Sequence, residues 1–499
     1  MDYPLRATGA RTTFVFLLAL LVSACVSTGE GKISRKDHVQ LEAALRSHIE
    51  TLADDGFEGR KPGTRGETLT LDYLRNQFEN IGFESGTNDP GNPWLAPVLL
   101  TASKPRDQKV ALVIGRRTVA LPTDQLVFYS DSRSQRVEGA EIVYTGGILS
   151  GLSEATVKGR IVLSLWSEGS EAAERQLLDM GATAVINVID DPAMLEEVRR
   201  RGERERFVLS GEEDGTLHAY ATEDAMSAGF GGDTWAELKA KAAAPGFEPY
   251  VLKTRINIET SSQVREVRTN NFVARLPGRV PNSGSILLMG HWDHLGICAE
   301  EGMLDRICNG AVDNASGVAL LIELSRRLAA NGPFDRDIYV LATTSEELGL
   351  LGAKAFAEAP SIPLDSIVAA FNFDTVAVAP NGKMLGFLGQ GMTPLDPVII
   401  STLHKMKRQL APEGEVQGFL RRQDGWALLG RDVPAVVLSS SLGDMALTQK
   451  FIDTHYHRPS DEARSLVLGG AIDDLLLHEV LVKQFASIRD YPGPVQQTH

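Results

Sequence analysis

Positive charge is scarce in this sequence. The 499 residues include 50 Lys and Arg but 65 Asp and Glu, and the formal net charge is -15 at pH 7. Binding to a phosphate backbone needs clustered Lys and Arg, so we expect no nucleic-acid partner. A G-x-S-x-G motif is also absent, which lowers the expectation of a serine hydrolase.

The apolar run near the N-terminus is too short for a membrane-spanning helix. It extends from about Phe14 to Val22, whereas a spanning helix needs about 20 residues. Two arginines precede it, as is typical of an export signal. The run ends in "VSAC", which resembles a bacterial lipobox, so Cys25 is the expected site of lipid attachment. We predict a lipoprotein signal peptide in residues 1–25 and a tether in residues 26–36. A plain signal peptide with an incidental cysteine is the alternative.

The predicted location is the bacterial cell envelope, with the lipid anchor as the sole membrane contact. Val26, rather than Asp, follows the lipobox cysteine. By resemblance to bacterial lipoproteins, this favours retention at the outer membrane, facing the periplasm.

Cysteine is also rare, and only Cys298 and Cys308 remain after Cys25. They flank the short segment "CAEEGMLDRIC". Disulfides persist in exported proteins, and a bond here would contribute about 2 to 4 kcal/mol by closing a short loop. Two free buried thiols are the alternative.

Changes in the pattern of apolar and polar residues divide the rest of the chain into three parts. Residues 37–104 contain two segments with helical apolar spacing and one strand-like run. Residues 105–249 contain short strand-like runs around an amphipathic helix, which predicts a smaller, β-rich α/β module. Residues 250–492 alternate strand, polar loop and helix, which predicts an α/β fold, a mixed sheet with helices on both faces. The first and third parts would form one catalytic domain with the second inserted into it.

Histidines and acids gather where the strands of the third part end. In α/β sheets, ligands bind beyond the carboxyl ends of the strands, so side chains that follow "SILLMG", "DIYVLAT" and "SIVAAFNF" should converge at one edge. Two further candidates lie in loops that can reach the same edge. The candidates are His291, Asp293, Asp313, Glu346, Glu347, Asp374 and His457.

Such a cluster of acids calls for a cation. Carboxylates that face one another repel and tend to protonate, and a divalent metal removes this conflict. Imidazole and carboxylate ligands suit zinc, which usually takes three protein ligands in a catalytic site. The five candidate ligands exceed that number, but they suffice for two Zn²⁺ if Asp313 bridges the ions, as in two-metal hydrolytic sites. They are His291, Asp313, Glu347, Asp374 and His457.

The adjacent glutamates divide two roles between them. Consecutive side chains leaving a strand point in opposite directions, so we expect Glu347 to bind metal and Glu346 to act as general base toward a metal-bound water. Asp293 is suited to hold the other ring N–H of His291. His294 and His455 lie next to proposed ligands and are alternatives to them.

Five segments that contain the candidate residues resemble those of a known family. The segments "GHWDHLG", "GAVDNASGVA", "TSEELGLLGA", "FNFDT" and "YHRPSD" occur in the order typical of the M28 family of zinc aminopeptidases, in its bacterial, PA-domain-containing lipoprotein branch. The resemblance implies a zinc-exopeptidase-like fold and Glu346 as the base. It also implies one zinc ligand set of His291, Asp313 and Asp374, and a second of Asp313, Glu347 and His457.

The resemblance extends over nearly the whole mature chain. "KGRIVLSLW" and "MGATAVINV" resemble parts of a protease-associated (PA) domain, so the module at 105–249 is expected to be PA-like. Asp424 aligns with an acid that the family usually has and is a candidate for substrate binding. Gly425 follows it where the family commonly has a polar residue.

We therefore expect an exported dinuclear-zinc aminopeptidase that hydrolyses N-terminal residues from peptides. An M28-type carboxypeptidase and a glutaminyl cyclase are alternatives within the same resemblance. A cell-surface binding protein with a vestigial metal site is the alternative from another class. Residue preference and oligomeric state stay open.

Overall fold

The computed structural model describes residues 33–493, apart from 168, 214, 413 and 415. The predicted signal peptide and Cys25 lie outside the described residues. Within them, no helix combines the length and the apolar character that crossing a membrane requires. The first helix, α1, begins at Arg35, so the last two residues of the predicted tether are already helical.

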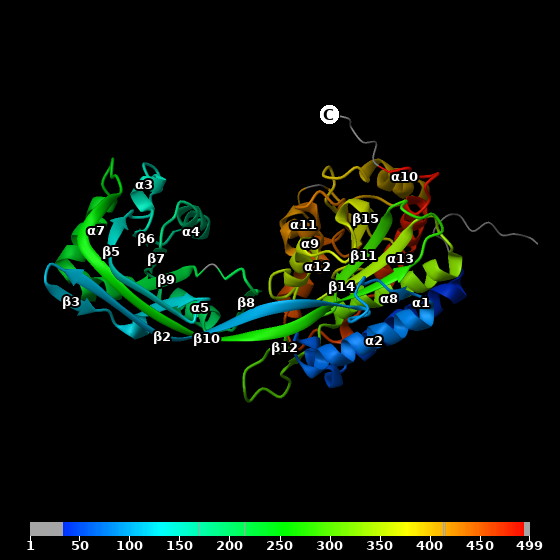
Figure 1. The fold of residues 1–499 in the computed structure, drawn as a ribbon, viewed down its shortest axis with the longest axis horizontal. Helices are drawn as coiled ribbons and strands as arrows, with labels where there is room; N and C mark the ends of the chain where they lie inside the picture. Colours follow the sequence, from blue (N-terminus) through cyan, green and yellow to red (C-terminus); the bar gives the residue numbers. More distant parts are fainter. Residues whose placement is uncertain (1–32, 168, 214, 413, 415, 494–499) are drawn as a thin grey trace, which may run out of the picture.

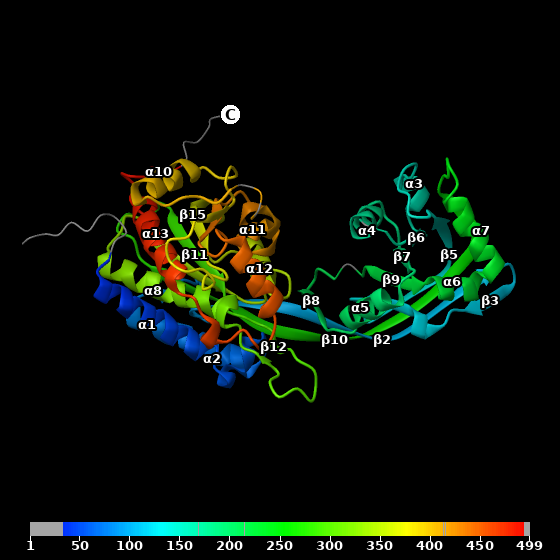
Figure 2. The same cartoon turned by 180° about the vertical axis from the view of Figure 1, so that it is seen from behind.

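Two lobes lie at opposite ends of an elongated molecule (Figures 1 and 2). Two long strands, β2 (Leu95–Ile114) and β10 (Tyr250–Leu276), connect them and pair antiparallel from Leu95–Phe272 to Val113–Arg255. The sheets of both lobes are therefore continuous through these two strands.

The two strand-like runs that the sequence shows on either side of Pro105 form the single strand β2. Pro105 lies opposite Ser262, where the register between β2 and β10 shifts. Proline cannot donate to the ladder and is tolerated at such an irregularity. The predicted boundary at residue 105 therefore falls inside a strand.

The larger lobe contains a mixed sheet in the order β16-β17-β15-β11-β14-β10. Its four central strands are mutually parallel, and the strands at either end run antiparallel to them. The strands other than β10 are β11 (Ser285–His291), β14 (Asp337–Thr343), β15 (Ile367–Asn372), β16 (Gly386–Leu388) and β17 (Ala435–Ser439).

Helices cover both faces of this sheet because successive strand residues point to opposite faces. In β11, Ile286 and Leu288 belong to one core, and Leu287 and Met289 to another. All seven residues of β11 are buried, as expected for a strand covered on both sides. The first core includes residues of α1 (Arg35–Leu52), α2 (Arg65–Ile81), α8 (Ser316–Asn331), α10 (Asp396–Met406), α12 (Met445–Thr454) and α13 (Gly469–Phe485). The second includes residues of α9 (Leu351–Glu358) and α11 (Gly425–Leu429).

The smaller lobe has a core of its own around the far ends of β2 and β10. Four strands run parallel in the order β5-β6-β7-β9, and β4 pairs antiparallel with β9. The strands are β3 (Arg117–Ala120), β4 (Leu126–Ser130), β5 (Ser134–Tyr144), β6 (Ile161–Leu165), β7 (Ala184–Ile189), β8 (Arg206–Leu209) and β9 (Leu217–Thr222). The helices are α3 (Glu154–Val157), α4 (Ser170–Asp179), α5 (Pro192–Gly202), α6 (Glu223–Phe230) and α7 (Gly232–Ala242). The amphipathic helix expected between two strands is α4, between β6 and β7.

Candidate metal centre

The predicted site residues lie at the carboxyl edge of the larger sheet. His291 is the last residue of β11, Glu346 and Glu347 follow β14, and Asp374 follows β15. These three strands are parallel neighbours, with β11 in the middle, so their ends meet at one edge as the sequence pattern predicts. Asp313 comes from the turn before α8.

Three residues in or beside the ligands have left-handed backbone conformations. Ser345, just before the two glutamates, has φ 55°, Thr375, just after Asp374, has φ 53°, and His457 has φ 59°. This conformation is uncommon for residues other than glycine, and such residues cluster at functional sites, where each costs of order 1–3 kcal/mol. The backbone is therefore bent sharply where it presents the candidate metal ligands.

Asp313 occupies the middle of the cluster and faces two sides. Its Oδ1 lies 3.3 Å from Nε2 of His291, and its Oδ2 lies 3.4 Å from Nε2 of His457. The carboxylate of Asp461 accepts hydrogen bonds from the backbone N–H groups of Val312 and Asp313, at 2.9 and 3.1 Å. This anchorage holds the Asp313 turn in place, and the carboxylate is positioned as a bridging ligand would be.

The remaining ligand candidates divide into two groups around Asp313. On one side, Nε2 of His291 lies 3.6 Å from Oδ1 of Asp374. On the other side, Nε2 of His457 lies 2.8 Å from Oε2 of Glu347. The structure thus brings together the two sets that the family resemblance implies, with Asp313 shared between them.

His294, which the sequence offers as an alternative ligand, lies close to the second ligand set. Its Nδ1 lies 2.5 Å from Oε1 of Glu347, and ligand atoms of His294, Asp313 and Glu347 all lie within 4.8 Å of one another. His455, the other alternative, forms its hydrogen bond with Ser460 instead, at 3.1 Å. His294 therefore competes with His457 for this position, whereas His455 is turned to a different partner.

The atoms that face the centre fit a metal. Among the described residues, Nε2 of His291, Nε2 of His457 and Oε1 of Glu347 are buried without a hydrogen-bond partner, although ion-pair distances link them to their neighbours. Buried polar atoms are normally hydrogen-bonded. A cluster of nitrogen and oxygen atoms without hydrogen-bond partners therefore indicates that another group binds between them. Imidazole and carboxylate donors are those that zinc takes.

Charge–charge contacts shift the pKa values across the cluster. Burial opposes ionisation of Asp313, but its contacts with His291 and His457 hold the pKa of its carboxyl well below the usual range. Burial likewise opposes protonation of His457, but Asp313 and Glu347 raise the pKa of this imidazole to about 10. The acids therefore have enough negative charge to hold a proton on the histidine, and a divalent cation would take the place of that proton.

Glu346 has the environment of a proton acceptor beside this centre. Its Oε2 lies 4.0 Å from Nε2 of His291. Burial raises the pKa of Glu346 well above its usual range, and the neighbouring Asp374 carboxylate raises it further. A carboxyl group with a raised pKa accepts a proton more readily and can return it.

Asp293 supports both His291 and the turn of Glu346. The ring Nδ1 of His291 bonds with the backbone carbonyl of Asp293, at 3.1 Å, whereas the Asp293 carboxylate lies 3.8 Å from that nitrogen. The Asp293 carboxylate is thus within ion-pair distance of His291, but the hydrogen bond from the ring goes to the Asp293 carbonyl. The carboxylate Oδ1 accepts the backbone N–H of Glu346, at 3.0 Å, so it fixes the glutamate turn.

A cavity that is open to solvent, about 660 Å³ with the solvent space included, lies beside the first ligand set. Acidic side chains lie at its metal-facing end, and the remaining wall is largely apolar. The acids are Asp313, Glu346 and Asp374, and the apolar residues are Leu388, Phe419, Val437, Leu442, Phe451 and Ile452. Arg422 and Tyr456 also line it, and sequence reasoning missed both, although Tyr456 adjoins the predicted ligand His457.

Asp424, the predicted substrate contact, lies behind the cavity wall. It is 1% exposed, and the hydroxyl of Thr343 donates to its Oδ2. Among the described residues that line the cavity, its neighbour Gln423 is present and Asp424 is not. In this structure Asp424 supports the end of β14, and its contact with substrate stays a prediction.

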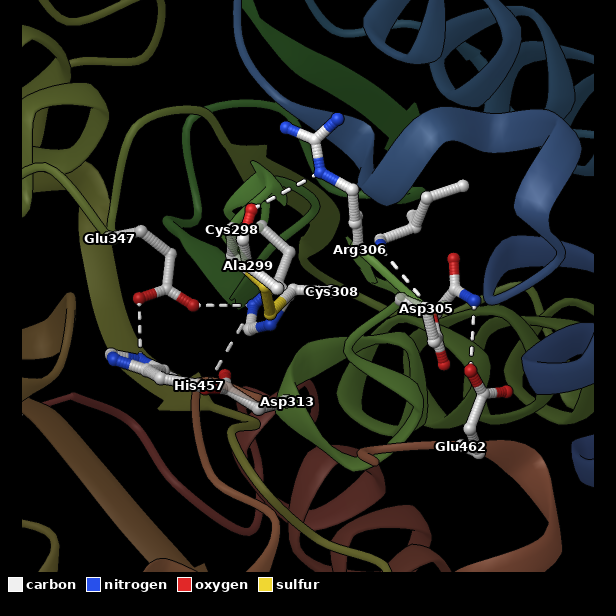
Figure 3. The surroundings of a disulfide bond; sticks show 12 residues. Cys298, Ala299, Asp305, Arg306, Cys308, Asp313, Glu347, His457 and Glu462 are labelled. Atoms are coloured by element: carbon white, nitrogen blue, oxygen red, sulfur yellow. Dashed lines mark hydrogen bonds and ion pairs between the residues drawn. A yellow bond between two sulfur atoms is a disulfide. The ribbon is translucent and has the colours of Figure 1, made fainter. Parts of the chain in front are cut away.

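The two cysteines form a disulfide next to the metal centre. Cys298 and Cys308 are bonded, with their Cα atoms 5.7 Å apart, and they close a small hairpin of β12 (Gly296–Ile297) and β13 (Ile307–Cys308). Figure 3 shows this bond beside Asp313, Glu347 and His457. The bond therefore braces the segment that leads into Asp313.

Comparisons with known proteins show what the chain is similar to. Residues 271–474 match the model of peptidase family M28. The aminopeptidase from Aneurinibacillus sp. strain AM-1 is similar in structure, with a TM-score of 0.54 and 18% identity over 90% of this chain and 96% of that chain. BSAP, a zinc aminopeptidase from Bacillus subtilis, has a TM-score of 0.48 and 15% identity over 90% of this chain and 96% of its own. Porphyromonas gingivalis glutaminyl cyclase has a TM-score of 0.34 and 19% identity over 44% of this chain and 77% of its own. No curated protein matches the sequence. The family model confirms the M28 resemblance over residues 271–474, and the Aneurinibacillus structure confirms the predicted fold class. The PA-domain-containing lipoprotein branch stays a prediction.

Proposed function

We propose, on the match of residues 271–474 to peptidase family M28, that the protein is an exported dinuclear-zinc aminopeptidase that removes N-terminal residues from peptides. The observation that carries the proposal is the division of ligands around Asp313. One oxygen of this carboxylate faces His291 and the other faces His457, with Glu346 beside the first set.

Two Zn²⁺ would be held by the residues that already converge. His291, Asp313 and Asp374 would hold one ion, and Asp313, Glu347 and His457 the other, with His294 within reach of the second set. Zinc, when bound, supplies Lewis-acid polarisation of the peptide carbonyl and lowers the pKa of a water molecule.

Glu346 would move the proton during hydrolysis. Its carboxylate accepts a proton from the attacking water and then donates it to the leaving amine of the peptide. The backbone N–H bond to Asp293 fixes the turn from which Glu346 reaches the centre. Its raised pKa suits this double duty.

The cavity supports cleavage at an apolar end residue. A side chain that enters it meets the apolar wall, while Glu346, the lining acid that is not a proposed zinc ligand, can attract a free N-terminal ammonium. This arrangement favours an aminopeptidase over an endopeptidase, because an apolar end residue and a free N-terminal ammonium suit the two parts of the cavity wall.

A carboxypeptidase is the second candidate because a cation also lines the cavity. The guanidinium of Arg422 lies over the ring of Phe419, with its Cζ 5.4 Å from the ring centroid. Arginine binds carboxylates through paired N–H donors, so this residue suits a C-terminal carboxylate. The match to family M28 does not distinguish an aminopeptidase from a carboxypeptidase, whereas peptides with an N-acetylated or a C-amidated end do.

Matched peptides with free, N-acetylated and C-amidated ends test the proposal, using protein that lacks residues 1–25, with and without chelator. We expect chelator-sensitive release of the first residue from free and C-amidated peptides, with acetylated peptides intact. Cleavage that C-amidation blocks would establish the carboxypeptidase. No cleavage of any peptide would favour a glutaminyl cyclase or a binding protein with a vestigial metal site.

The role of Glu346 is tested separately. Glu346→Gln should lower kcat by about 10²- to 10⁴-fold while two equivalents of zinc stay bound. Loss of zinc together with activity would contradict the division of roles between Glu346 and Glu347.

We propose the location and the second lobe's identity from the sequence alone. Lipid attachment at Cys25 would place the enzyme at the outer membrane, and Cys25→Ala should then release it from the membrane fraction. The smaller lobe would be PA-like, and its excision tests whether it selects peptides by length. Unchanged length preference after excision would contradict a gating role.

A further inference from the structure

A fully buried arginine lies under the metal centre. Arg60 is 1% exposed and ends the short 3-10 helix of residues 55–60, in the turn "EGRKPGTRG" between α1 and α2. The function proposed above does not use it. A buried guanidinium is costly unless hydrogen bonds compensate for its lost hydration.

All four hydrogen bonds of the Arg60 side chain go to backbone carbonyls. Nε donates to the carbonyl of Trp292 at 2.9 Å, and Nη2 donates to that of Gly310 at 2.9 Å. Nη1 donates to the carbonyls of Asn309 at 2.5 Å and Leu52 at 2.8 Å. One planar group thus joins three separate segments of the chain.

Two of these segments carry the metal ligands. Trp292 lies between His291 and Asp293, and Gly310 is three residues before Asp313. The backbone also connects in return, because the N–H of His294 donates to the carbonyl of Arg60 at 3.3 Å. The side chain of Arg60 therefore links the segment of His291 to the segment of Asp313.

The turn that carries Arg60 fits closely against the same segments. A Cβ atom on the preceding Gly59 would lie 2.4 Å from the carbonyl oxygen of Cys308 and 2.8 Å from the Cα of Gly296. Gly59 also has φ 63°, which glycine adopts without strain. The turn is therefore seated against the disulfide hairpin, with little space to move.

The charge of Arg60 also acts on the cluster. Burial lowers its pKa to about 10, while the carboxylates of Asp461, Asp313, Asp293 and Glu347 oppose this. The guanidinium is thus a fixed cation among the acids before any metal binds. It offsets part of their mutual repulsion in the metal-free protein.

We propose that Arg60 is a positioning residue that sets the spacing of the His291 and Asp313 segments and so preorganises the zinc site. The inference rests on the proposed function, since it takes these residues as zinc ligands. Residues outside a metal's own ligands that orient them typically account for 10- to 100-fold in metal affinity.

Arg336 offers a matched control. It is 2% exposed and likewise donates to backbone carbonyls, those of Ser283, Phe485 and Tyr491, at 2.8, 2.6 and 2.7 Å. These acceptors lie outside the segments that hold the candidate ligands. Its removal therefore reports the general cost of losing a buried arginine clamp.

The experiment uses four variants of the chain that lacks residues 1–25: Arg60→Lys, Arg60→Met, Arg336→Lys and Arg336→Met. Zinc affinity is measured by competition with a chromophoric chelator, alongside Tm of the zinc-free protein and kcat and KM. The lysine variants retain a charge and are expected to fold where a methionine variant does not.

We expect both Arg60 variants to bind at least one zinc 10- to 100-fold more weakly and to lose kcat at limiting zinc, with kcat restored toward wild type at saturating zinc. Both Arg336 variants should lose Tm and keep zinc affinity within about twofold of wild type, since they disturb no ligand segment. Wild-type zinc affinity in folded Arg60→Lys, or an equal loss in Arg336→Lys, would overturn the positioning role. Failure of the wild-type chain itself to bind zinc would instead overturn the proposed function.

Discussion

Removing the Cys298–Cys308 disulfide should destabilise the larger lobe by an amount that the loop length sets. The two cysteines are 10 residues apart, and closing such a loop removes about 9 cal/mol/K of chain entropy from the unfolded state, or about 2.7 kcal/mol at 25 °C. Cys308 is fully buried, so alanine is the suitable replacement there, because a serine hydroxyl would lack a partner. The test variant is Cys298→Ser with Cys308→Ala.

Urea unfolding of the zinc-free chain lacking residues 1–25, followed by circular dichroism, measures the loss. The variant and the reduced wild-type protein should show the same lowered midpoint, and reductant should not affect the variant. Met303, at 61% exposed in the same loop, supplies the control, since Met303→Ser should change stability by less than about 0.5 kcal/mol. A wild-type midpoint in the reduced protein would refute the reasoning, because the loop would then be held by its other contacts.

Two further predictions concern pH and substrate. Burial lowers the pKa of His478 to about 4, so the unfolded chain binds a proton that the folded chain does not. The contribution of His478 to the free energy of unfolding is therefore complete above about pH 7. It is lost as the pH falls through 6.5 toward 4, by about 2 kcal/mol between pH 7 and 4.5. His478→Gln should show a smaller drop in urea midpoint over that pH range than the wild-type chain, and an equal drop would contradict the low pKa of His478. Ile452 lies on the apolar wall of the cavity, so Ile452→Asp should lower kcat/KM for leucyl peptides by tenfold or more and raise the relative use of lysyl peptides. Unchanged preference would place the substrate side chain elsewhere.

The convergence of the site was predictable from sequence because it depends on strand direction. Buried apolar runs such as "SILLMG" and "DIYVLAT" predict strands that are covered on both faces, and parallel neighbours bring their carboxyl ends together. Once His291, Glu347 and Asp374 follow three such strands, few arrangements keep them apart. The coarse placement of the ligands therefore follows from periodicity and order alone.

Contacts that run through the backbone were not predictable in the same way. The sequence contains Asp293 near His291, but whether the carboxylate or the carbonyl meets the imidazole depends on the turn between them, and the carbonyl does. Arg60 bonds only through carbonyls of other segments, a role that leaves no spacing signal beyond the turn it belongs to. Pro105 gave a misleading signal, because a proline normally ends a strand and here a register shift accommodates it.

The choice between neighbouring ligands depends on single dihedral angles. His457 has φ 59°, so its ring points in a different direction from the ring of a residue with extended backbone. The His457 ring reaches Glu347, whereas the His455 ring bonds Ser460. Ser345 has a similar φ just before Glu346 and Glu347, and it directs one of them to the ligand set and the other to the cavity. Side-chain chemistry therefore defines which residues can bind metal, and the position of a few strained residues decides which of them do.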